Sequence, residues 1–89
     1  MLTAQRTYEL LIEREHLACK AMQWLARRGC LVAGTYTTPF QAHIYLLRKP
    51  TVELMDSATY RITGRAGNRI AHVKAEVCDC EVYWRELIQ

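Results

Sequence analysis

The first 28 residues carry the pattern that most constrains this chain, because apolar side chains recur there at helical spacing. We expect a helix over about residues 4–28, with one apolar stripe facing a core. Thr3 or Thr7 is the predicted N-cap, since a hydroxyl there accepts a hydrogen bond from a free backbone N–H. Gly29 suits the left-handed position that follows the last helical turn. The stripe contains Tyr8, Leu11, Ala18, Met22, Leu25 and Ala26.

A second apolar strip runs beside this stripe. Leu17 and Trp24 are seven residues apart and lie off the main stripe, together with Leu10 and Ala21. One interpretation is a wide core face on a small protein. The other is a surface for a partner, since exposed aromatic strips often mark interfaces. The second interpretation predicts a partner-binding surface made of Leu17, Trp24, Arg27 and Arg28.

From Cys30 onward the pattern changes from helical spacing to alternation, which is typical of strands. We expect antiparallel strands over residues 30–37 and 41–47. Pro39 lies between them and breaks the pattern, because proline cannot donate to a strand ladder. Two further strands are expected over residues 51–55 and 58–63. Asp56-Ser57 marks a turn between these two, and residues 64–68 form the next turn.

Residues 69–88 fit two different patterns. The strand interpretation rests on four alternating apolar residues, Ala71, Val73, Ala75 and Val77. The helical interpretation starts at Asn68 as N-cap and places apolar residues every three or four positions. We favour a hairpin over residues 58–77, followed by a short helix that is capped by Asp79 and ends near Ile88. One long final helix is the alternative.

The predicted fold is a single α+β domain over residues 1–89. Its N-terminal amphipathic helix packs on an antiparallel β-sheet of four or five strands, and a short C-terminal helix closes the core or an interface. A chain of 89 residues buries only roughly 60–65% of the surface it exposes when unfolded. The core is therefore thin, and dimerisation would be an ordinary way to bury more apolar surface.

Composition narrows the class of protein. The chain is 51% hydrophobic and 24% charged, which is typical of a globular domain. No apolar run approaches the ~20 residues that span a bilayer, and no signal-peptide pattern opens the chain. We expect a cytoplasmic protein with no membrane partner. Its four cysteines are expected to be reduced thiols, Cys19, Cys30, Cys78 and Cys80.

No catalytic, cofactor or metal motif is recognisable in the sequence. His16 and Cys19 are three residues apart, and Cys78 and Cys80 are two apart. The Cys78–Cys80 pair is tighter than the ligand pairs of zinc knuckles, and a His and a Cys three residues apart on a helix are common by chance. We therefore expect no enzyme activity, no cofactor and no metal site.

Two functions are compatible with this absence of chemistry. The first is a small non-catalytic module that regulates or inhibits a larger protein or nucleoprotein complex through protein–protein contacts, alone or as a homodimer. Small proteins encoded by phages and other mobile elements often act in this way, which is a general tendency and not a resemblance. The second is nucleic-acid binding by a basic tip, which the mild net charge of +3 permits but does not by itself indicate. The residues of this tip are Arg61, Arg65, Arg69 and Lys74.

Strand tyrosines bear on the second function. Tyr36, Tyr45 and Tyr60 would offer stacking surfaces to bases if they pointed outward. Tyrosine is common in strands for packing reasons alone, so packing against the helix is the favoured interpretation.

Overall fold

The computed structural model describes residues 1–50, 58–65 and 67–88. Its only helix within these residues is α1 (Ala4–Arg27). The Thr3 hydroxyl accepts a hydrogen bond of 3.1 Å from the backbone N–H of Arg6, and Gly29 follows the helix with φ at +74°. The predicted helix and its Thr3 cap are therefore confirmed, and Gly29 takes the left-handed conformation expected of it.

Both apolar strips of α1 face the sheet. The buried residues Ala18, Ala21 and Leu25 lie along the middle of this face. Beside them, Leu17, Met22 and Trp24 are partly buried and pack against the core. Tyr8 and Ala26 were expected on the core stripe but are exposed. The core face of the helix thus runs between the two predicted strips and takes side chains from each.

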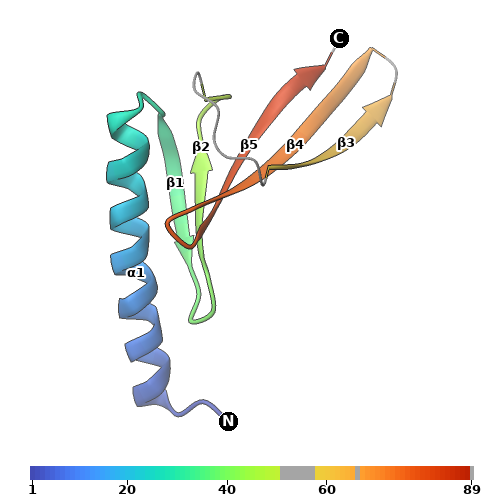
Figure 1. The fold of residues 1–89 in the computed structure, drawn as a ribbon. Helices are drawn as coiled ribbons and strands as arrows, with labels where there is room; N and C mark the ends of the chain where they lie inside the picture. The colour runs from blue at the N-terminus through green and yellow to red at the C-terminus, as the bar shows by residue number, and fades with distance from the viewer. Residues whose placement is uncertain (51–57, 66, 89) are drawn as a thin grey trace.

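Five strands form one mixed sheet in the order β1-β2-β5-β4-β3 (Figure 1). The bounds are β1 (Val32–Thr37), β2 (Ala42–Leu46), β3 (Thr59–Arg65), β4 (Asn68–Val77) and β5 (Cys80–Ile88). β2 and β5 are parallel, whereas the other neighbours are antiparallel. The expectation of a purely antiparallel sheet is therefore wrong. No tight turn joins β2 to β5, because β3 and β4 lie between them in the chain.

The described strands otherwise follow the predicted ones closely. Residues 30–37, 41–47 and 58–63 were expected to be strands, and β1, β2 and β3 occupy these segments. The predicted hairpin over residues 58–77 is formed by β3 and β4. The strand expected over residues 51–55 lies outside the described residues.

The end of the chain differs from the expectation. β5 occupies residues 80–88, so the short C-terminal helix is wrong, and the alternative of one long final helix is also wrong. Cys78 and Asp79 adopt φ values of +50° and +62° between the paired residues Val77 and Cys80. Two left-handed residues in a two-residue loop are the geometry of a tight hairpin turn. Asp79 therefore reverses the chain instead of capping a helix.

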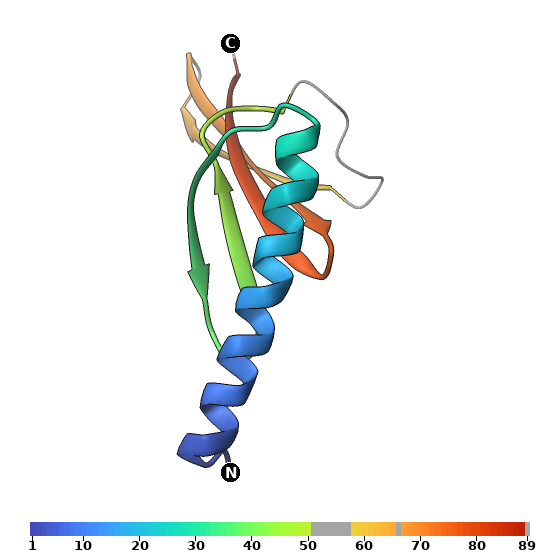
Figure 2. The same cartoon turned by 90° about the vertical axis from the view of Figure 1, so that its left-hand side faces the viewer.

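The core lies between α1 and one face of the sheet. Figure 2 shows the helix running across this face, and its contacts are with β1, β2 and β5. Alternate residues of the strands are buried there: Ala42, Ile44 and Leu46 in β2, Ala71, Val73, Ala75 and Val77 in β4, and Cys80, Val82 and Trp84 in β5. The intervening residues point to the other side. We call that side the open face, since no helix or strand of the described residues covers it.

Candidate functional site

Four aromatic side chains form a row across three strands of the open face. Tyr36 of β1 lies opposite His43 of β2, and Tyr45 of β2 lies opposite Tyr83 of β5. The ring centroids are 6.1 Å apart for Tyr36 and His43, 5.7 Å for His43 and Tyr83, and 5.1 Å for Tyr45 and Tyr83. We call these four residues the aromatic row. It presents nearly parallel rings over the β1–β2–β5 part of the sheet.

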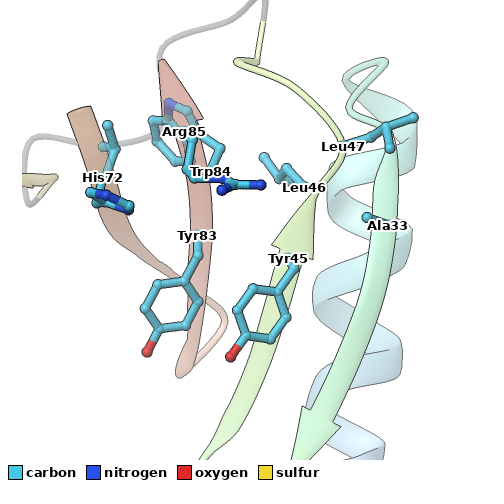
Figure 3. A pocket seen from close by; sticks show the side chains of 9 residues that line it. Ala33, Tyr45, Leu46, Leu47, His72, Tyr83, Trp84 and Arg85 are labelled. Atoms are coloured by element: carbon cyan, nitrogen blue, oxygen red, sulfur yellow. The ribbon is translucent and has the colours of Figure 1, made fainter. Parts of the chain in front are cut away.

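Strand alternation places these rings away from the helix. Ala42, Ile44 and Leu46 are buried in the core, so His43 and Tyr45 between them point to the open face. Figure 3 shows Tyr45 and Tyr83 side by side, with their hydroxyl groups directed the same way. The expectation that the strand tyrosines pack against the helix is therefore wrong for Tyr36 and Tyr45. Tyr60 lies on the helix side of the sheet but is exposed.

A hydrogen-bond network holds the two middle rings of the row, His43 and Tyr83. The Tyr83 hydroxyl donates to the Glu81 carboxylate. His43 Nδ1 lies 3.0 Å from the Tyr83 oxygen and 3.3 Å from the same carboxylate. The Tyr83 hydroxyl hydrogen is already donated to Glu81. We therefore assign a proton to His43 Nδ1, which donates a hydrogen bond to the Tyr83 oxygen. Lys74 Nζ lies 3.9 Å from the other Glu81 oxygen, so two cation-capable groups flank this carboxylate.

This network shifts two pKa values in opposite directions. The hydrogen bond from Tyr83 lowers the pKa of Glu81, and Lys74 and His43 lower it further. Burial raises the pKa of Tyr83, and the hydrogen bond and charge of Glu81 raise it again. The carboxylate therefore stays ionised and the phenol stays protonated around neutral pH. The Tyr83 ring is held in place by a stable donor–acceptor pair.

Basic side chains occupy the other part of the open face. In the strand register His72 of β4 lies opposite Arg61 of β3 and Arg85 of β5. Lys74 lies opposite Tyr83, next to the aromatic row. His72 Nε2 is 2.9 Å from the Thr63 hydroxyl, which orients its ring. Within residues 1–50, 58–65 and 67–88, neither Arg61 nor Arg85 forms an ion pair, and both residues are exposed.

Two shallow hollows connect the aromatic and basic parts. The larger, about 480 Å³, lies beside Tyr45 and Arg85 (Figure 3). The smaller, about 380 Å³, lies beside Arg61 and Lys74. Both are lined by Tyr83 and His72. We call this pair of hollows the groove. It offers flat rings and positive charge within one continuous surface, which suits an elongated anionic ligand that has planar groups.

The four residues of the predicted basic tip do not all lie on the same surface of the structure. Arg61 and Lys74 both line the smaller hollow of the groove. Arg65 lies at the end of β3 near the turn, opposite Asn68. Arg69 lies opposite Gly64, and its position alternates with the open-face residues of β4, so it belongs to the opposite face. Two of the four predicted residues thus join the groove.

Three groove residues were missed in the sequence, namely His72, Tyr83 and Arg85. Arg85 and Tyr83 fell in the segment expected to be helical, where strand alternation was not applied. The signal was present: Cys80, Val82 and Trp84 are apolar and alternate with the polar or aromatic residues Glu81, Tyr83 and Arg85. Read as a strand, that segment places Tyr83 and Arg85 on one face.

The predicted partner surface at the end of α1 has a different character. The Arg28 guanidinium carbon lies 3.5 Å from the centroid of the Trp24 ring. The same guanidinium donates to the Trp24 carbonyl oxygen at 3.2 Å. Leu17 packs against the core, and Arg27 is exposed at the last turn. Arg28 covers part of the indole, and binding of a partner by these residues stays a prediction.

The cysteines divide into two exposed and two buried thiols. Cys19 and Cys78 are exposed, whereas Cys30 and Cys80 are buried, and all four are free. Burial raises the pKa of Cys80 to about 11 and also raises the pKa of Cys30. In the described part of the chain, no group of three or more His, Cys, Asp or Glu side chains is arranged to hold a metal ion.

These features define an α+β protein in which one helix covers the β1–β2–β5 part of one face of a mixed sheet and leaves an aromatic and basic face open. Comparison with known proteins finds no matching family model, no significant match among curated proteins and none among solved structures. No helix in the described ranges has both the length and the apolar character that crossing a membrane requires.

Proposed function

We propose that this protein binds single-stranded nucleic acid across the open face of its sheet. The observation that carries the proposal is the aromatic row beside the exposed arginines Arg61 and Arg85. Tyr36 and Tyr45 are 62% and 45% exposed, so their rings are accessible to a ligand. Such a surface supports base contacts and phosphate contacts at the same time.

Base stacking explains why the rings would matter. Every nucleobase has a flat π surface, and stacking on an aromatic side chain contributes about 1–3 kcal/mol per base. The bases of a duplex are stacked on one another and are not accessible in this way, whereas those of a single strand can turn toward protein rings. The aromatic row therefore favours a single strand over a duplex.

Phosphate contacts explain the basic part of the groove. Arg61 and Arg85 lie on strands that flank β4, on the same face as the aromatic row. An arginine binds phosphate oxygens through two parallel N–H donors, which strengthens and orients the contact. The Glu81 carboxylate repels a phosphate only weakly, because its negative charge is already in contact with Tyr83, His43 and Lys74. We place the phosphate backbone along Arg61 and Arg85.

A titration with labelled oligonucleotides tests the proposal. Fluorescence anisotropy would compare a mixed-sequence single-stranded RNA, a single-stranded DNA of the same sequence and the matching duplexes. Each would be measured at about 50 mM and about 200 mM salt, because phosphate contacts make affinity fall with salt. We expect saturable binding of single strands, weaker binding of duplexes and a clear loss of affinity at the higher salt. No binding at low salt, or equal binding of both forms, would refute the proposal.

A further inference from the structure

The two edges of the sheet differ in regularity. The β1 edge has a register shift between Val32 and Gly34, and such irregularities discourage pairing with another strand. The β3 edge pairs with β4 through seven consecutive residue pairs without a shift, and its backbone is extended up to Gly64, where φ is +103°. On its other side β3 has no neighbouring strand in the described part of the sheet. A regular outer edge is a template for strand addition.

β3 also carries uncovered apolar side chains. Tyr60 and Ile62 lie on the helix side of the sheet, opposite the buried residues Val73 and Ala71 of β4. They are nevertheless 63% and 57% exposed. The reason is that α1 contacts β1, β2 and β5, at the other end of the sheet (Figure 1). An outer strand with exposed apolar residues on one side is suited to an interface.

The chain is more extended than a compact monomer of its mass. A compact monomer of 10.3 kDa exposes about 5,400 Å². This chain exposes 6511 Å². The difference exceeds the roughly 800 Å² that each partner contributes to a standard interface. The radius of gyration of 14.9 Å is likewise above the ~12 Å expected for a compact domain of this length.

We propose that the β3 edge binds a second copy of this chain, antiparallel and about a two-fold axis at Ile62. Closed two-fold dimers are the commonest oligomers, and their interfaces are self-complementary. The same sequence supplies both halves, so the charge pattern of β3 decides the register. The pairing would join the two sheets edge to edge, with both open faces on the same side.

The register follows from the positions of the two arginines. An axis at Ile62 uses all seven residues and places Arg61 opposite Thr63 of the partner subunit. It also places Tyr60 opposite Gly64 of the partner subunit, where a ring can cover a residue that has no side chain. An axis at Thr63 would place Arg61 opposite Arg65 of the partner subunit. An axis at Arg61 would place that arginine opposite its own copy, and like charges in these positions destabilise a sheet.

Sedimentation equilibrium of the full chain, from micromolar to several hundred micromolar, is the first test. We expect a dimer, with a mass twice the 10.3 kDa of the chain. Ile62→Lys would place two ammonium groups opposite each other and is expected to weaken the dimer on the order of tenfold or more. Ile62→Thr keeps a β-branched residue and should keep the dimer. Tyr8→Lys is the matched control, because Tyr8 is similarly exposed but lies on α1.

A cross-linking experiment tests the register itself. In a background of Cys19→Ser and Cys78→Ser, Ile62→Cys would face its own copy and form a disulfide-linked dimer under mild oxidation. Thr59→Cys would lie about 20 Å from its own copy, six residues along the strand, and should not cross-link. A chain that is monomeric at all concentrations overturns the proposal. So does a dimer that survives Ile62→Lys, or one that Tyr8→Lys dissociates instead. Ile62 lies on the side opposite the groove, so these outcomes are independent of nucleic-acid binding.

Discussion

Tyr45 and Tyr83 lie opposite each other on the parallel strands β2 and β5, with ring centroids 5.1 Å apart and ring planes 19° apart. The two rings differ in how they are held. The hydroxyl of Tyr83 is bonded to Glu81, whereas Tyr45 has no side-chain hydrogen bond within the described residues and is 45% exposed. The pair therefore combines a fixed ring with an accessible one, and Tyr45 is the more informative position to change.

Removal of the Tyr45 ring should weaken binding of single strands. We expect Tyr45→Ala to reduce affinity roughly five- to hundredfold, which corresponds to one lost stacking contact of about 1–3 kcal/mol. Tyr45→Phe keeps the ring and should bind like the wild type. Tyr8→Ala is the control, because Tyr8 is an exposed tyrosine on α1 that lines neither hollow of the groove. Fluorescence anisotropy measures all three, and an equal loss in Tyr8→Ala would contradict the assignment of the open face.

Removal of groove arginines should change the salt dependence of binding. We expect Arg61→Ala and Arg85→Ala each to lower the slope of log affinity against log salt by about 0.7, the value for one phosphate contact with a single strand. Arg69→Ala is the control, since Arg69 lies on the other face of β4. Titrations at four or more salt concentrations give the slopes. An unchanged slope in both groove variants would exclude phosphate contacts by these arginines.

Glu81 and Tyr83 should make stability depend on pH at both ends of the range. The folded-state pKa of Glu81 lies below its ordinary value of 4.5, mainly through the hydrogen bond from Tyr83. Its contribution is therefore complete above pH 4.5 and is lost as pH falls through the lower folded value. The pKa of Tyr83 is raised above 10.0, mainly by burial, so its contribution is present below pH 10.0 and is lost as pH rises through the higher folded value.

Urea unfolding across the pH range checks this prediction. Glu81→Gln should flatten the fall of unfolding free energy on the acid side, and Tyr83→Phe should flatten it on the alkaline side. Glu76→Gln serves as the control, because Glu76 lies opposite Glu81 in the hairpin but is not bonded to Tyr83. If Glu76→Gln flattens the acid side as much as Glu81→Gln does, the network is not the cause.

The β3–β4 turn should depend on Gly64 more than on the other glycines. Gly64 has φ at +103°, and a Cβ there would overlap the carbonyl oxygen of Asn68. We expect Gly64→Ala to cost about 2 kcal/mol or more, from strained φ and from this overlap. Gly67→Ala should cost about 1 kcal/mol, because its φ is +90° but no atom lies within 4 Å. Gly34→Ala should have little effect, and thermal unfolding of the three variants would show whether this order holds.

The fold was predictable where local pattern and tertiary packing agree. The N-terminal helix has a cap and a helical stripe, and β4 alternates without a break, so both follow from the sequence. β5 was harder, because Val77, Cys80, Trp84 and Leu87 also fit helical spacing. The deciding feature is the turn at Cys78-Asp79. These two residues are not the Asn-Gly or Asp-Gly pair that usually marks such a turn, so the hairpin had no recognisable signal.

The site was predictable only in part, because it combines residues from separate hairpins. Arg61 and Lys74 were grouped from the sequence, and they lie on neighbouring strands of one hairpin. The contact of Tyr45 with Tyr83 depends on the parallel pairing of β2 with β5, which no short-range signal encodes. The complete aromatic row therefore could not be predicted from the sequence without knowledge of that pairing.

The parallel β2–β5 pair has a consequence for the order of folding. The β1–β2 hairpin and the β3–β4–β5 meander are each built from contacts between neighbouring segments, which form quickly. Their junction joins segments far apart in the chain, so its closure carries the larger entropic cost and should come late. Because the aromatic row crosses this junction, a complete binding surface exists only after both parts have docked. A ligand that contacts both Tyr45 and Tyr83 would then stabilise the β2–β5 junction and slow its opening.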